Sequence, residues 1–133
     1  MRTGSALRLA RDERGFTLVE LLVVLVVIGV LLAIAVPAYL GFAARARATA
    51  SAADVREATS AAEAYFVDNR SYSGISAAQL KTIDAGISPN LQTVKAENGG
   101  SGYCISAQVG SSWAHLVGPG GQVSTNETAD NCP

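Results

Sequence analysis

The stretch Gly15-Phe16-Thr17-Leu18-Val19-Glu20 opens an apolar run that carries no further charged residue until Arg45. An acidic side chain inside a bilayer is unfavourable, by roughly 2.5 to 3.5 kcal/mol at the centre of a spanning helix and by less towards its ends. Such a residue normally has a charged partner and a function. The stretch therefore predicts a membrane helix whose single acid, Glu20, has a specific role.

The residues that follow are long and apolar enough to cross a bilayer. From Leu21 to Ala38 there are eighteen uncharged residues, mostly Leu, Val, Ile and Ala. As a helix they would extend about 27 Å, close to the hydrocarbon thickness of a membrane. Arg45 and Arg47 follow the run, and four arginines precede it: Arg2, Arg8, Arg11 and Arg14. By the positive-inside rule, we expect the N-terminus in the cytoplasm and the C-terminal part outside.

Three interpretations of this segment compete. A secretory signal peptide would use Ala33-Ile34-Ala35 as its cleavage site, but the apolar run continues past it. A plain single-pass anchor explains the length but not Glu20, Gly29 or Pro37. The third interpretation is a segment that is cut before the apolar run and keeps the run for assembly.

The third interpretation agrees with a family resemblance. Residues 14–24, with the sequence RGFTLVELLVV, resemble the class III signal of type IV pilins and their relatives, and the resemblance continues through residues 28–39. The residues that carry the resemblance are Gly15 at the cut site, Phe16 directly after it and Glu20 four residues later. The resemblance implies that a membrane peptidase cuts between Gly15 and Phe16 on the cytoplasmic side and methylates the new amine of Phe16.

The resemblance also divides the chain. Residues 1–15 would be a cleaved cytoplasmic leader, residues 16–44 a transmembrane and filament-core helix, and residues 45–133 a globular head. In a filament, Glu20 could reach the Phe16 amine of a neighbouring subunit. An unpaired charge in low dielectric is heavily penalised whereas a paired one is tolerated, so we expect this pair to set the register of the subunits. The alternative is a carboxylate near the head groups, favoured by the helix dipole.

Two residues are expected to weaken the apolar helix. Pro37 has no amide hydrogen, so the carbonyl of Ala33 loses its helical partner. Gly29 weakens the helix one turn earlier. The resemblance to pilins implies that the segment from Gly29 to Pro37 melts on assembly, and the alternative is a simple kink in a continuous helix.

The rest of the chain predicts an α+β head. A long helix is expected from about Phe16 to Val67, and a short helix from Ala77 to Ile83 with Ser76 as its N-cap. The long helix has an apolar face at 4-3-4-3-4 spacing: Ala48, Ala52, Val55, Thr59, Ala62 and Phe66. Glycine-bounded runs predict four antiparallel strands that cover this face: residues 91–96, 103–109, 113–117 and 122–125.

Both cysteines, Cys104 and Cys132, lie beyond the apolar run. In an exported chain we expect them to form a disulfide, and the alternative is a pair of buried thiols. Closing a loop of this length stabilises a fold by roughly 3 to 4 kcal/mol in the chain-entropy model. The bridge would attach the C-terminal tail to the second strand.

The composition argues against several other functions. The net charge of −1 gives no basic field that would favour nucleic acid. His115 is the only histidine, and no nucleophile motif accompanies it, so no enzyme is expected. The cysteines and this histidine lack metal-ligand spacing, and no cofactor is expected. Glu127 and Asp130 are weak candidates for a calcium site, which the resemblance to secretion pseudopilins would suggest.

Together these observations predict the precursor of a type IV pilin, the major subunit of a cell-surface filament. Its expected partners are copies of itself, the prepilin peptidase, the pilus assembly machinery and, before assembly, the inner membrane. Two alternatives remain open: a pseudopilin of a type II secretion or competence system, and a membrane-anchored binding domain that never polymerises.

Overall fold

The computed structural model describes residues 15–133, which divide into two compact units that meet between Ala38 and Tyr39. Residues 1–14, which make up most of the expected leader, lie outside the described residues. The first unit is the N-terminal part of helix α1 (Leu18–Asn69), which is helical throughout its length.

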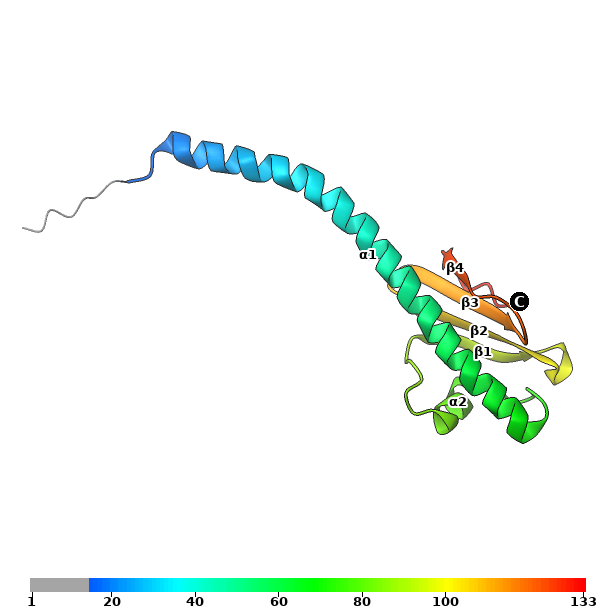
Figure 1. Ribbon diagram of the computed structural model, residues 1–133. Coiled ribbons are helices and arrows are strands. Elements are labelled where there is room, and N and C mark those ends of the chain that lie inside the picture. The colour runs from blue at the N-terminus through cyan, green and yellow to red at the C-terminus, as the bar shows by residue number, and fades with distance from the viewer. Residues whose placement is uncertain (1–14) are drawn as a thin grey trace, which may run out of the picture. The chain divides into compact units, whose positions relative to one another are not determined.

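The second unit packs the rest of α1 against a small sheet. Its elements are listed in chain order: α2 (Ala77–Ile83), β1 (Leu91–Glu97), η1 (Asn98–Gly100), β2 (Gly102–Val109), β3 (Ser112–Gly118) and β4 (Ser124–Glu127). The sheet has the order β1-β2-β3-β4, and each neighbouring pair is antiparallel. Figure 1 shows α1 lying across one face of this sheet, with α2 beside β1. The predicted α+β fold is confirmed.

The core lies between α1 and the inner face of the sheet. On β2, residues from Gly102 to Ala107 are buried, since this strand lies between β1 and β3. On α1 the predicted face is largely confirmed, but Thr59 and Phe66 are only partly buried. Ala58 and Tyr65 are buried in addition, so the helix buries a broader stripe than the spacing alone predicts.

Element boundaries follow the caps and turns. The long helix begins at Leu18 rather than Phe16, and it ends at Asn69 rather than Val67. Arg70, the first residue after the helix, adopts a positive φ of 57°, and its amide donates to the carbonyl of Phe66 at 2.7 Å, which ends the helix at Asn69.

The head elements match their predictions closely. The short helix has the predicted bounds, and the hydroxyl of Ser76 accepts a hydrogen bond from the amide of Gln79 as its N-cap. The last strand begins two residues later than predicted, at Ser124, because residues 119–123 between Gly118 and this strand have no regular secondary structure.

Candidate processing and assembly site

The start of α1 is closed by a reciprocal hydrogen-bonding motif. The amide and the hydroxyl of Thr17 both donate to the Glu20 carboxylate at 2.8 Å, and the Glu20 amide donates to the Thr17 hydroxyl at 3.1 Å. This is a capping box, in which two residues three positions apart accept hydrogen bonds from each other's backbone amides. These amides would otherwise lack partners at the start of the helix. It explains why the helix begins after Thr17. The sequence contains this signal as Thr-x-x-Glu at residues 17–20, and it places the helix start after Thr17 rather than at the predicted Phe16.

The predicted cleavage site lies just before this cap. Gly15 and Phe16 have no regular secondary structure, and Phe16 is 84% exposed. A β-carbon added at Gly15 would have no neighbour within 4 Å. Packing in the described structure therefore does not require glycine at this position, and the peptide bond after it is open to a protease.

The surface of α1 beyond the cap is apolar and uncovered. Every large apolar side chain between Phe16 and Phe42 is at least 46% exposed. The helix includes an 18-residue window with mean hydropathy 3.2 and no buried residue, which is long and apolar enough to cross a membrane. Gly29 and Pro37 both lie inside this continuous helix, and a side chain at Gly29 would meet nothing within 4 Å. Such a surface needs lipid or other helices to cover it.

In the head, one acid of α1 binds two tyrosines from other elements. The phenol of Tyr72 donates to the Glu63 carboxylate at 3.0 Å, and the phenol of Tyr103 donates to it at 2.8 Å. The two tyrosine rings also contact each other, with centroids 4.7 Å apart. Burial, followed by the hydrogen bond and the charge of Glu63, raises the pKa of Tyr72 to about 12 and raises that of Tyr103 further. Glu63 is exposed, and no local pattern in the sequence predicts that it binds two tyrosines.

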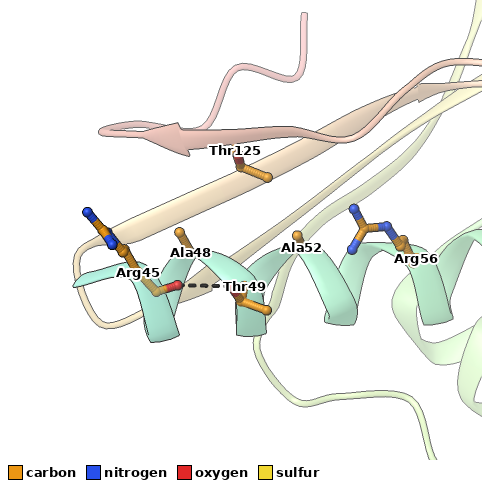
Figure 2. A pocket seen from close by; sticks show the side chains of 6 residues that line it. All are labelled: Arg45, Ala48, Thr49, Ala52, Arg56 and Thr125. Atoms are coloured by element: carbon orange, nitrogen blue, oxygen red, sulfur yellow. Dashed lines mark hydrogen bonds between the residues drawn. The ribbon is translucent and has the colours of Figure 1, made fainter. Parts of the chain in front are cut away.

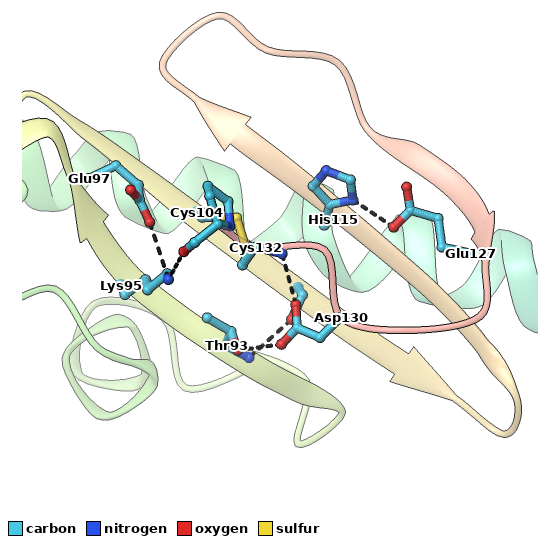
Figure 3. The surroundings of a disulfide bond; sticks show 10 residues. Thr93, Lys95, Glu97, Cys104, His115, Glu127, Asp130 and Cys132 are labelled. Carbon is cyan, nitrogen blue, oxygen red and sulfur yellow. Dashed lines mark hydrogen bonds and ion pairs between the residues drawn. A yellow bond between two sulfur atoms is a disulfide. The ribbon is translucent and has the colours of Figure 1, made fainter.

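The C-terminal loop is attached to the sheet by a disulfide and by hydrogen bonds (Figure 3). Cys104 on β2 and Cys132 are disulfide-bonded, with Cα atoms 5.7 Å apart. The Asp130 carboxylate accepts hydrogen bonds from the Thr93 hydroxyl and from the Cys132 amide. Burial would raise the pKa of Asp130, but these hydrogen bonds outweigh it and hold the pKa below its usual value. The side chain of Lys95 reaches the terminal carbonyl of the chain.

The two acids considered for calcium are both bound to protein donors. Glu127 contacts His115, with the Nδ1 to Oε2 distance 2.7 Å, and accepts a hydrogen bond from Ser124. His115 is half-buried on β3. Among residues 15–133 no group of three His, Cys, Asp or Glu side chains lies close enough to hold a metal. Glu127 and Asp130 thus stabilise the loop.

Comparisons with known proteins agree with this geometry. Residues 10–36 match the family model described as the prokaryotic N-terminal methylation motif, which includes the Gly15–Phe16 bond and Glu20. The type IV wide pilus major component of Thermus thermophilus is 31% identical over 134 residues, which cover 92% of this chain and 99% of that protein.

Two further relatives represent different branches. The type II secretion system core protein G of Escherichia coli is 31% identical over 117 residues, covering 86% of this chain and 78% of that protein. A fimbrial protein of Pseudomonas aeruginosa is 37% identical over 60 residues, covering 45% of this chain and 39% of that protein. The chain has an exposed apolar helix and a small antiparallel sheet, and one of its relatives matches it almost from end to end. It therefore belongs to the family of type IV pilins and pseudopilins.

Proposed function

We propose that this chain is the precursor of a type IV pilus subunit, most simply the major one, which polymerises through its apolar helix. The observation that carries the proposal is the uncovered apolar surface from Phe16 to Phe42, which begins beside a single carboxylate. The end-to-end match to a major pilus component in Thermus thermophilus supports the same function. The work of such a protein is mechanical: it supplies cohesion to a filament.

Processing would precede assembly. The precursor sits in the inner membrane with its N-terminus in the cytoplasm, where a prepilin peptidase cuts between Gly15 and Phe16. The same enzyme methylates the new amine of Phe16. The exposed, irregular backbone at these two residues supports this step, because a protease needs an extended substrate.

Glu20 would then change partners. In the subunit its carboxylate accepts two hydrogen bonds from Thr17. Cleavage creates a cationic amine at Phe16, and in the filament the carboxylate of one subunit pairs with the amine of the next. A stagger that left either charge unpaired in the apolar filament core would be strongly penalised, so the pair selects the register. The segment from Gly29 to Pro37 is the part of the helix that would melt during assembly.

The test separates register from helix capping. Glu20→Ala should yield an inserted and processed protein that forms few filaments. Thr17→Val is the matched control, because it removes the cap hydroxyl, worth about 1 kcal/mol, and leaves the charge. We expect Thr17→Val to assemble normally. Normal filament yield from Glu20→Ala, measured by shearing and electron microscopy, would contradict the register role, and an equal defect in both variants would assign the effect to the cap.

The cleavage site has its own test. Gly15→Val should block removal of the leader without disturbing the subunit, because position 15 is surrounded by open space. Mass spectrometry of the membrane fraction measures the mass of the chain. A mature chain that begins at Phe16 in this variant would refute the proposed site.

The second candidate function is a pseudopilin of a type II secretion system, favoured by the match to core protein G over 78% of its length. The helix is common to both, so the head must decide. The disulfide-attached C-terminal loop, whose acids are bound to protein donors, favours the pilin. Long surface filaments that contain this chain would support the pilin, whereas their absence would favour a pseudopilin or a membrane-anchored binding domain.

A further inference from the structure

An open pocket lies between α1 and β4 at the end of the head where the apolar run stops. Figure 2 shows Arg45 and Arg56 of α1 at its two ends, with Thr125 of β4 opposite the helix. Between the arginines the helix contributes three small side chains: Ala48, Thr49 and Ala52. These side chains leave a volume of about 390 Å³.

The lining of this pocket is positively charged and contains no acid. Arg45 and Arg56 are exposed, and neither has a carboxylate within ion-pair distance in the described part of the chain. The Thr49 hydroxyl donates to the carbonyl of Arg45 at 3.0 Å and can still accept a hydrogen bond from a ligand. The lining therefore suits a ligand group that combines a negative charge with hydroxyls. It offers no counter-charge to an ammonium group.

The depth of Arg45 along the helix corresponds to the head groups of a membrane. Arg45 is the first charged residue after Glu20, and twenty-five positions separate them (45 − 20), or about 37 Å of helix. The hydrocarbon core of a bilayer is about 30 Å thick, and about 40 to 45 Å with its head groups. With Glu20 at the inner surface, Arg45 reaches the phosphates of the outer surface. Arg56 lies about 16 Å further out, more than a Debye length of about 8 Å.

Two exposed aromatic side chains precede the pocket on the same compact unit, Tyr39 and Phe42. Phe42 lies three residues before Arg45 and seven before Thr49, which places it one and two turns below them on one side of α1. Aromatic rings are enriched at membrane–water interfaces, where they sit at the level of the head groups. A lipid whose acyl chains pack along Phe42 would therefore direct its head group towards Arg45.

We propose that this pocket binds the head group of an anionic phospholipid in the outer leaflet, with the phosphate on Arg45. A guanidinium donates two parallel hydrogen bonds to a phosphate, and hydroxyls of the head group would reach Thr49. The fitting class is a phosphatidylglycerol, whereas the ammonium of a phosphatidylethanolamine would face two arginines without a carboxylate. The inference rests on the proposed membrane-inserted precursor and adds a lipid that holds its head on the membrane before assembly.

Native mass spectrometry of the full chain tests the site. The chain is released from micelles that contain equal amounts of phosphatidylglycerol and phosphatidylethanolamine with the same acyl chains. Wild-type chain should carry mainly phosphatidylglycerol. Arg45→Gln should lower this bound fraction about fivefold, the effect of one cation near a membrane surface. Arg45→Lys keeps the charge but loses the paired hydrogen bonds, so it should lower the fraction about twofold.

Arg47→Gln is the matched control, because it makes the same change in charge at almost the same depth. Position 47 lies about 3 Å along and about 200° around the helix from Arg45. Its side chain lies against Gly110 in the turn between β2 and β3, outside the pocket. We expect Arg47→Gln to change lipid binding less than twofold. An equal loss in Arg45→Gln and Arg47→Gln would show a general effect of surface charge and would overturn the site.

Other outcomes also overturn the inference. Wild-type chain that carries both lipids equally, or Arg45→Gln that keeps its phosphatidylglycerol, would contradict it. Binding of glycerol 3-phosphate in lipid-free neutral detergent, with the same dependence on Arg45, would assign the pocket to a soluble anion instead. Cells that form filaments of a chain without lipid preference would overturn the lipid site and leave the proposed function standing. A chain absent from the membrane fraction would overturn both.

Discussion

Removing the carboxylate of Glu63 should destabilise the head more than the loss of any other exposed acid of α1. Glu63→Ala leaves the phenols of Tyr72 and Tyr103 without their acceptor. Their side chains are nearly inaccessible, with Tyr72 2% exposed and Tyr103 0% exposed. A buried hydroxyl that loses its partner costs about 1 to 3 kcal/mol.

Glu63 as a residue is exposed, so water can enter where its side chain is removed, and this limits the effect. We therefore expect Glu63→Ala to lower the free energy of unfolding by about 2 to 4 kcal/mol. Glu63→Gln keeps one acceptor oxygen and loses the charge, so it should lower the free energy by about half as much.

The assay is urea unfolding of the mature chain in detergent micelles. The fluorescence of Trp113, the only tryptophan, reports on the sheet. Glu57→Ala is the matched control, since it removes an exposed helix acid without a partner and should change the free energy by less than about 0.5 kcal/mol. The reasoning is refuted if Glu63→Ala unfolds at the same urea concentration as Glu57→Ala.

Three further outcomes follow from the same contacts. The pKa values of Tyr72 and Tyr103 are raised in the folded state, which means that folding favours the protonated phenols. The free energy of unfolding should therefore be constant up to about pH 9 and fall between about pH 10 and pH 12. Urea titrations at several pH values measure this fall. Replacing both Cys104 and Cys132 with serine should lower the free energy of unfolding by roughly 3 to 4 kcal/mol in the same urea assay. A loss below about 1 kcal/mol would show that the C-terminal loop is held mainly by its hydrogen bonds. Gly118→Ala would place a β-carbon 2.3 Å from the Tyr103 ring. The substitution should lower the free energy of unfolding by about 1 to 3 kcal/mol and shift the tyrosine absorbance. Unchanged stability would show that β3 moves to make room for the added carbon.

Much of the fold was predictable because its signals are local. The apolar run after Glu20 predicts a helix that could cross a membrane, because eighteen uncharged residues in a helix are about as long as the bilayer is thick. The glycine-rich breaks predict the antiparallel order, and Ser76 predicts the start of α2. Each signal depends on a few neighbouring residues and on the helical or strand period.

The candidate site was predictable in part. Gly15, Phe16 and Glu20 are proposed as site residues through the resemblance to the pilin signal. The two hydrogen bonds from Thr17 to Glu20 were missed, although Thr-x-x-Glu is a known start signal of helices. The two hydrogen bonds that Glu63 accepts were not predictable, because its partners Tyr72 and Tyr103 are nine and forty residues away. No helical period encodes such a distance.

The sequence by itself determined which segment is long and apolar enough to cross a membrane, where the chain is expected to be cut and which segments form helix or strand. Those properties follow from the order of charged, apolar and turn-forming residues. Only the tertiary structure decided which acids are engaged within the subunit and which remain available, as Glu63 and Glu57 illustrate. The physical reason is that a hydrogen bond needs two groups within about 3 Å, and packing alone brings together groups that are distant in the chain.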